Sequence, residues 1–303
     1  MSQLVTDQAV VAGPSAARRL GDGSVGLLRM MRRNTVGFIG FIVVALIVVI
    51  SFVGPIFVAA GETNTLQILK PPTSAHPLGT DFQGRDVLAQ LIRGGQTVLI
   101  VGFIAATLTT LIAVAFGSLA AYAGGWVDSL ITGAADVVLT VPQLPLLAVL
   151  AAFVSFRTAW QLALIIAVLA WPTLLRAIRA QVLSLRERDY VEAAQTLDLG
   201  TAHILFREIL PNMRSYIAIN FAIGMTNAIY AQIALYFLGL APLSGDNWGI
   251  MINLANARGA IYFQNSFWYI MSPVLAIAIL QLALVTMTRS LEDIFNPRLR
   301  QND

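Results

Sequence analysis

The chain has 303 residues, of which 57% are hydrophobic and 12% are charged, and its net charge is +3. Because soluble domains carry about 25% charged residues, this composition excludes a large water-facing domain and indicates that lipid covers the chain. The basic residues border apolar segments and do not alternate with aromatic ones, which argues against nucleic-acid binding. The sequence contains no cysteine, so disulfides, thiolate catalysis and cysteine metal sites are excluded.

Six apolar segments are long enough to cross a hydrocarbon core of about 30 Å, which takes about 20 helical residues. They cover approximately residues 37–59, 97–121, 129–154, 159–178, 215–240 and 268–289. Pro142 and Pro145 lie within the third segment and predict a bend or an interruption of its helix. The sequence therefore predicts an all-α membrane protein with six transmembrane helices.

The distribution of basic residues predicts the orientation of these helices. Most Lys and Arg lie in or directly beside residues 1–36, 179–214 and 291–303. The remaining ones are Lys70, Arg85, Arg93, Arg157 and Arg258. By the positive-inside rule both termini are cytoplasmic. The expected organisation is a cytoplasmic segment 1–36, a first transmembrane helix 37–59, an extracytoplasmic loop 60–96, a five-helix core 97–290 with the cytoplasmic loop 179–214, and a cytoplasmic tail 291–303.

The cytoplasmic loop contains a pattern typical of a short amphipathic helix. Val191, Ala194 and Leu197 recur at helical spacing and predict a helix over residues 189–198. Gly200 is expected to end that helix in a left-handed conformation. A second short helix follows, and Pro211 is expected to interrupt or restart the chain before the fifth segment.

Two interpretations of this loop remain open from the residues alone. The small side chains of Ala193 and Ala194 allow another protein to approach closely, as when a helix docks into a groove. The alternative is a solvated connector whose helix lies at the membrane surface.

The predicted outer loop contains His76, Asp81 and Asp86, which could be mistaken for metal ligands. They are not at i, i+4 spacing and include one histidine, so metal binding is disfavoured. We expect a folded loop in which Asp81 caps a helix that starts near Phe82.

A few polar residues lie within the apolar segments. Asp136 is an acidic residue well inside a span, for which a structural or gating role is expected first and contact with a solute or proton second. Asn220, Asn227 and Gln232 could also line a path, although helix–helix hydrogen bonds account for most such residues.

The loop at 179–214 resembles the coupling loop of binding-protein-dependent ABC importers. The residues that carry the resemblance are Glu192, Ala193, Ala194, Ile209, Leu210 and Pro211. The glycine of that family falls on Asp198 here, with Gly200 two residues later, which leaves open whether the turn is displaced. By this resemblance, the residues that would contact an ATPase are Tyr190, Val191, Glu192, Ala193, Ala194, Leu197, Asp198 and Gly200.

Further motifs resemble the dipeptide/oligopeptide/nickel permease family, on the side of its second permease. They are His76-Pro77-Leu78-Gly79-Thr80-Asp81 with Gly84-Arg85-Asp86, Ser184-Leu185-Arg186-Glu187-Arg188-Asp189-Tyr190, Trp248-Gly249 and Asn296-Pro297-Arg298. The resemblance implies the type I ABC importer permease fold in a bacterial inner membrane. It also implies a non-catalytic subunit that binds no cofactor or metal itself.

The same resemblance implies the partners and the solute. The expected partners are a homologous second permease, two cytoplasmic ATPase subunits that bind ATP and Mg, and an extracytoplasmic solute-binding protein. Di- and oligopeptides are the expected solutes, with oligosaccharides or nickel as alternatives. A secondary transporter driven by an ion gradient is the rival interpretation, and it would predict inverted repeats and paired charges within the membrane.

Overall fold

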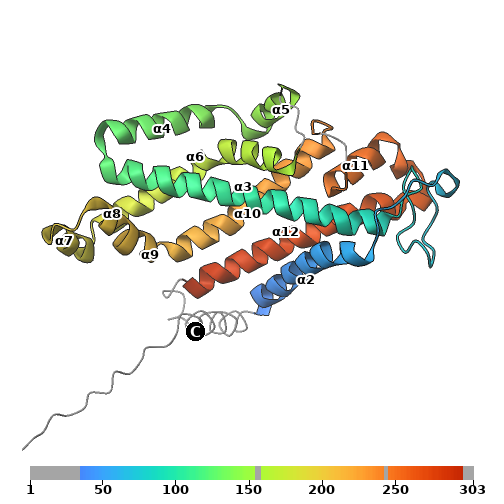
Figure 1. Cartoon of the computed structure of the whole chain (residues 1–303), viewed down its shortest axis with the longest axis horizontal. Coiled ribbons are helices and arrows are strands. Elements are labelled where there is room, and N and C mark those ends of the chain that lie inside the picture. The colour runs from blue at the N-terminus through green and yellow to red at the C-terminus, as the bar shows by residue number, and fades with distance from the viewer. Residues whose placement is uncertain (1–34, 154–157, 242–244, 296–303) are drawn as a thin grey trace, which may run out of the picture.

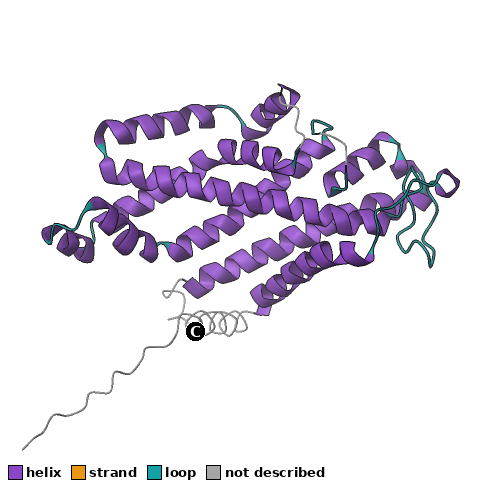
Figure 2. Cartoon of the chain, viewed as in Figure 1, coloured by secondary structure: helices purple, strands orange, loops and turns teal. Residues whose placement is uncertain are grey.

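The computed structural model describes residues 35–153, 158–241 and 245–295, and these form a bundle of helices (Figure 1). Figure 2 shows helices joined by loops throughout the described residues, where the one β-type pairing is an isolated bridge between Thr80 and Asp86. The all-α prediction is therefore confirmed. The predictions for residues 1–34 and for the motif Asn296-Pro297-Arg298 lie outside the described residues.

Five helices are long and apolar enough to cross a membrane. They are α2 (Thr35–Phe57), α3 (Val87–Ala123), α6 (Ala159–Arg186), α10 (Arg214–Phe237) and α12 (Phe267–Phe295). A sixth crossing is possible if α4 (Gly125–Thr140) and α5 (Gln143–Phe153) are counted together, and these two helices meet at 85°. The break falls at Val141 and Pro142, as the two prolines in this segment predicted.

Helix α3 begins ten residues before the predicted start at 97, which shortens the outer loop. The carboxylate of Asp86 accepts a hydrogen bond from the Ala89 N–H at 2.9 Å and caps the helix. The expectation that Asp81 caps a helix near Phe82 is wrong, because Asp81 is used inside the loop, as described below. Helix α6 likewise continues eight residues past its predicted end at 178, since residues beyond 178, such as Val182, are still buried against the bundle.

An unpredicted helix, α11 (Trp248–Ala257), lies between the fifth and sixth predicted segments. Its Trp248 ring covers Gly94 and Gly95 of α3, where a Cβ on Gly95 would lie 3.0 Å from the ring. The indole N–H of Trp248 donates to the carbonyl of Leu91 at 2.8 Å. Two glycines that weaken an isolated helix are therefore helical here because α11 packs on them.

Helix α3 is the central element and contacts α2, α4, α6, α10, α11 and α12. Helix α2 lies beside α12, as Figure 1 shows, and Gly40 has no room for a Cβ against Thr286 of α12. Small residues at such a crossing let two membrane helices approach closely.

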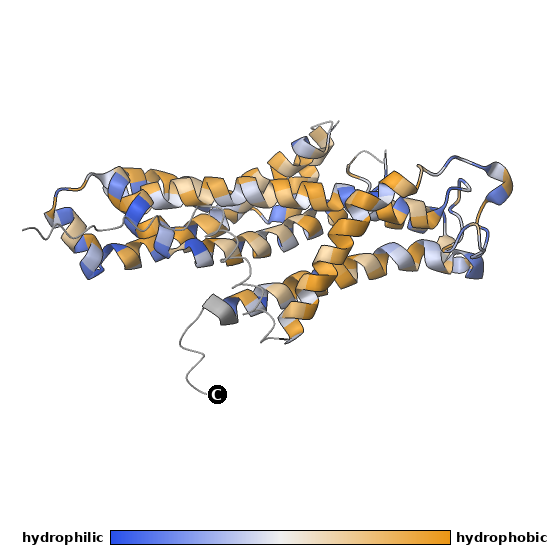
Figure 3. Cartoon of the chain, turned by 60° about the horizontal axis from the view of Figure 1, so that its bottom comes forward, coloured by the Kyte–Doolittle hydropathy of each residue, from blue (hydrophilic) through white to orange (hydrophobic). Residues whose placement is uncertain are grey.

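The two ends of the bundle differ. The end of α3 at Ala123 carries the elbow, which we define as α7 (Asp189–Thr196), α8 (Thr201–His203), the π-helical η2 (Ile204–Ile209) and α9 (Leu210–Asn212). The opposite, or loop, end carries residues 58–86 with η1 (Thr65–Gln67), α11, η3 (Ala260–Tyr262) and η4 (Gln264–Ser266). Figure 3 shows hydrophobic residues along the helices between these ends and more hydrophilic ones at both.

Candidate functional site

Helix α7 is anchored to the bundle by one side. Val191 and Ala194 are 0% and 4% exposed and belong to a core cluster that includes Leu175 and Ile178 of α6. Leu197, the third residue of the predicted apolar pattern, is 73% exposed instead. The predicted helix is confirmed, but Val191 and Ala194 hold it in place and do not present their side chains to a partner.

The turn after α7 is built on Asp198 and not on Gly200. The Leu199 N–H donates to the Ala194 carbonyl at 3.1 Å and the Asp198 N–H to the Gln195 carbonyl at 2.9 Å, which is a Schellman motif. Asp198 has φ +51°, whereas Gly200 has φ −55°, so the prediction that Gly200 is left-handed is wrong. The turn therefore lies where the resembled family has its glycine, and it is not displaced.

This geometry predicts the effect of restoring the glycine. Because a left-handed residue with a Cβ is strained, Asp198→Gly is expected to stabilise the folded protein by about 1 kcal/mol, and Asp198→Val to destabilise it by about 1–2 kcal/mol. The thermal unfolding of the purified protein in detergent measures both. A lower unfolding temperature for the glycine variant than for the native chain would contradict the assigned turn.

The second half of the elbow is a nearly continuous helix with a π-helical stretch. Ile204, Ile209 and Met213 are buried in the same cluster as Val191, while Phe206 is 65% exposed. Pro211 occupies the first turn of α9, where the π-helical stretch gives way to an α-helix, but the residues before it are already helical and the chain is not interrupted there.

The outer side of the elbow forms a surface that we call the elbow face. Its members are all exposed and are Tyr190, Glu192, Ala193, Gln195 and Leu197. It combines a carboxylate, a small side chain and exposed apolar groups on a segment held from behind. Such a combination suits contact with another protein better than contact with water alone.

The elbow is also linked to the end of α3. Arg186, the last residue of α6, donates to the carbonyls of Ala121 and Tyr122 at 3.2 and 3.4 Å. Its guanidinium lies 5.5 Å from the centre of the Tyr122 ring. Because these are free carbonyls at a helix C-terminus, a cation there is favourable. A displacement of the elbow would therefore act on α3 and α6 together.

Two ion pairs join α4 to α6. Asp136 pairs with Arg176, and Asp128 pairs with Arg179, whose Nε lies 2.6 Å from Oδ1 of Asp128. From the sequence, Asp136 had no partner and paired charges within the spans were not expected. The structure corrects this, because α6 brings Arg176, near the end of the predicted fourth segment, beside Asp136 and continues far enough to place Arg179, which was assigned to the loop, beside Asp128.

The other polar residues proposed for a path do not converge with Asp136. Gln232 is 0% exposed and donates to the Val98 carbonyl of α3 at 2.7 Å, so it joins two helices and lines no space. Asn220 donates to the Tyr216 carbonyl one turn earlier at 2.9 Å. Asn227 is exposed at the side of a pocket.

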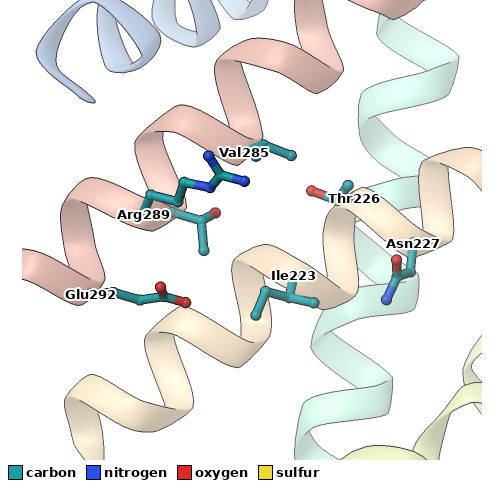
Figure 4. Close-up of a pocket in the computed structure, with 7 residues that line it drawn as sticks. Ile223, Thr226, Asn227, Val285, Arg289 and Glu292 are labelled. Atoms are coloured by element: carbon teal, nitrogen blue, oxygen red, sulfur yellow. The ribbon is translucent and has the colours of Figure 1, made fainter. Parts of the chain in front are cut away.

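That pocket lies between α10 and α12 and has a volume of about 310 Å³. It is lined by Ile223, Thr226, Asn227, Val285, Thr288, Arg289 and Glu292. In Figure 4, Thr226 extends from α10 and Arg289 from α12 into the space between the two helices. Asn227 therefore borders a charged pocket on a different helix pair from that of Asp136.

At the loop end, Asp81 is completely buried and holds the segment 58–86 together. Its carboxylate accepts hydrogen bonds from the backbone N–H groups of Gln83 and Arg85 at 2.7 and 2.8 Å. It also accepts from the Arg85 Nε at 2.8 Å and from the Gln90 side chain at 3.0 Å. The motif that includes Asp81 is therefore a folding device of the loop, with every acceptor site of the carboxylate used.

His76 and Asp86 interact separately from Asp81. The His76 Nδ1 lies 2.7 Å from an Asp86 oxygen and its Nε2 lies 2.9 Å from the Gln67 side-chain oxygen. Within the described ranges no three His, Asp or Glu side chains gather around one point. His76 therefore fastens the loop to the start of α3.

A further ion pair joins α3 to the segment before α11. The Arg93 Nε lies 3.3 Å from Asp246. Burial raises the pKa of the Asp246 carboxyl above its usual value, and the nearby charges of Arg85 and Arg93 oppose that rise. This end of the molecule is thus cross-linked by several polar contacts, of which those of Asp81 are buried and those of His76 and Arg93 are partly buried.

Comparison with known proteins places this architecture in a family. Residues 113–301 match the model of the binding-protein-dependent transport system inner membrane component. The chain belongs to this family. Residues 26–72 also match the N-terminal transmembrane domain of oligopeptide transport permease C.

Individual relatives resemble the permease over most of its length. It is 34% identical to a putative peptide permease protein of Brucella suis biovar 1, over 80% of this chain and 79% of the relative. It is 30% identical to the oligopeptide transport system permease protein OppC of Bacillus subtilis, over 89% and 88%. It is 31% identical to the dipeptide transport system permease protein DppC of Haemophilus influenzae, over 89% and 93%.

The family confirms the resemblance drawn from the sequence motifs and decides against a secondary transporter. The permease is an integral membrane protein of a transport system. Two functional features were missed in the sequence, the Arg176 partner of Asp136 and the left-handed Asp198. Arg176 lies at the end of an apolar run, and the only signal for its pairing was the presence of single opposite charges on two neighbouring segments.

Proposed function

We propose that the permease is the non-catalytic membrane subunit of an ATP-driven importer of di- and oligopeptides. The observation that carries this proposal is the elbow, a short helix anchored to α3 and α6 on one side with Glu192 and Ala193 exposed on the other. The peptide solute is supported by the names of the relatives, which are peptide, oligopeptide and dipeptide permeases.

In this proposal the elbow face docks on a cytoplasmic ATPase subunit. Moving a two-state protein from 1:99 to 99:1 takes about 5.5 kcal/mol of differential binding. A rigid helix can transmit that energy, because Val191 and Ala194 tie it to the bundle core and Arg186 ties the adjoining end of α6 to α3. The glycine-like turn at Asp198 keeps the second half of the elbow at a defined angle to the first.

The remaining partners follow from the same proposal. A homologous second permease completes the path, and a solute-binding protein delivers peptide to the loop end, whose buried Asp81 network gives it a fixed shape. ATP and Mg bind to two separate ATPase subunits. Both termini and the elbow are then cytoplasmic, as the distribution of basic residues favours.

A binding measurement tests whether nucleotide binds to the ATPase subunits and not to the permease. The purified permease alone is expected to bind no nucleotide, while the complete importer binds ATP and hydrolyses it faster when peptide-loaded binding protein is added. Titration with a fluorescent ATP analogue checks the first part, with the complete importer as the positive control. Saturable ATP binding by the isolated permease would overturn the assignment.

A further inference from the structure

The ion pair between Asp136 and Arg176 is unusual for its exposure. The two side chains are 58% and 54% exposed, although they lie inside long helices. Asp136 is about 16 Å along α4 from its first residue, and Arg176 is about 15 Å along α6 from its last, at a rise of 1.5 Å per residue. Both charges therefore lie away from the ends of their helices and face outward from this chain.

Lipid is an unfavourable neighbour for these charges. Ionised groups within transmembrane segments face a protein interior or a water-filled space, and they pair with one another. The second pair, Asp128 with Arg179, is only 20% and 31% exposed and fits a structural link between the helices. Asp136 and Arg176 keep a large accessible surface beyond their mutual contact.

A stripe of small and polar residues surrounds the exposed pair. On α4, the exposed residues Ser129, Gly133, Asp136 and Thr140 are spaced by four, three and four positions, so they share one face of the helix. A Cβ added at Gly133 would meet no atom within 4 Å, so the surface is open there.

Helix α6 continues this surface. Thr173, Arg176 and Ala180 are all exposed and are spaced by three and four positions. The large apolar residues of α4, Leu130 and Val137, lie on the adjoining face and are 63% and 69% exposed. Helix α4 therefore presents two different surfaces side by side, one polar and one apolar.

We propose that Asp136 and Arg176 form a contact site for the charged groups of a peptide, on the wall of a water-filled path lined by this stripe. The proposal rests on the proposed peptide importer. An arginine guanidinium binds a carboxylate through two parallel hydrogen bonds, and an aspartate accepts hydrogen bonds from an ammonium group. A peptide carries both groups at its ends, so it can replace each partner of the pair by an equivalent one.

The second ion pair makes such an exchange structurally possible. When a peptide separates Asp136 from Arg176, the contact between Asp128 and Arg179 still holds α4 on α6. In the absence of peptide the internal pair closes again, and neither charge is left without a partner. The competing possibility is that a second permease covers the stripe, since small residues also suit close helix packing.

Cysteine labelling separates these possibilities, because the native chain has no cysteine. Gly133→Cys and Thr173→Cys are compared with Leu130→Cys and Val137→Cys in the complete importer in membrane vesicles. The probe is a charged thiol reagent, and label is counted on the permease band after electrophoresis. The two stripe positions are expected to react about tenfold faster than the two apolar ones, since the reacting thiolate needs water, and added peptide is expected to slow them.

Two charge-removing variants test the site itself. Asp136→Asn and Arg176→Gln are expected to raise the peptide concentration for half-maximal ATPase stimulation about tenfold. Glu187→Gln, at an exposed carboxylate after the end of α6 and away from both ion pairs, is the control that leaves this concentration unchanged. Equal labelling on both faces of α4 overturns the path. Fast labelling without protection by peptide, together with unchanged half-maximal concentrations, overturns the contact site. If the native importer responds to no peptide at all, the proposed function fails, and the labelling rates still report on the path.

Discussion

Replacing Glu192 by lysine is expected to leave the permease folded in the membrane and to reduce peptide uptake about tenfold or more. Glu192 is exposed on the elbow face, so its substitution disturbs no internal contact. If the facing ATPase surface is basic, a lysine replaces an attraction by a repulsion that costs several kcal/mol, and about 1.4 kcal/mol already corresponds to a tenfold change. Uptake into vesicles containing the reconstituted importer, measured beside its ATPase rate, checks this result.

Two further variants sharpen this prediction. Ala193→Asp adds bulk and charge next to Glu192 and is expected to have the same effect, because a small residue allows close approach. Glu187→Lys, an equal charge reversal in the residue that follows the end of α6, lies outside α7 and is expected to have a much smaller effect. If the double variant Glu192→Lys/Ala193→Asp retains full uptake and peptide-stimulated hydrolysis, the elbow is not where the ATPase acts.

Replacing Asp81 by asparagine is expected to lower the free energy of unfolding by about 3 kcal/mol. The asparagine keeps the shape of the side chain but removes the charge that pairs with Arg85 at 2.8 Å, and its amide nitrogen replaces an oxygen that accepts hydrogen bonds. Because Asp81 is 0% exposed, water cannot substitute for the lost acceptor. The midpoint of unfolding by sodium dodecyl sulfate in mixed micelles measures the change.

A matched substitution in the same loop provides the control. Glu62 is exposed, and Glu62→Gln is expected to leave the unfolding midpoint where it is in the native protein. If Asp81→Asn is as stable as Glu62→Gln, the network around Asp81 does not hold the outer loop. The double variant Asp81→Asn/Arg85→Gln separates the contribution of the ion pair from that of the backbone hydrogen bonds. Because both substitutions remove the same ion pair, their effects on the free energy of unfolding are expected to be less than additive.

Much of the architecture could be predicted because it depends on local composition. A long apolar helix is the stable form of such a segment in lipid, whatever surrounds it. The break at Pro142 follows from the missing N–H of proline, and the start of α7 at Asp189 follows from a helical apolar pattern. The family resemblance was likewise contained in short motifs, above all the run from Glu192 to Ala194 and the run that ends at Pro211.

The rest was decided by contacts between distant segments. Gly94 and Gly95 weaken a helix on their own, and in the structure the Trp248 ring packs on them within the first turns of α3, which Asp86 caps. Sequence alone could not predict that packing, because Trp248 lies more than 150 residues away.

The candidate site shows the same division. The apolar residues that keep α7 on the bundle were visible in the sequence. The residue that takes the left-handed conformation was not, because the turn depends on the hydrogen bond from the Leu199 N–H to the Ala194 carbonyl, which places Asp198 at that position. Asp136 and Arg176 are 40 positions apart in the sequence, and they pair because α4 and α6 lie side by side. The sequence by itself thus determined the membrane helices and the elbow helix, because lipid and local periodicity act on neighbouring residues. The tertiary structure decided the ends of the helices and the partners of the charges, because close packing and ion pairing act across space.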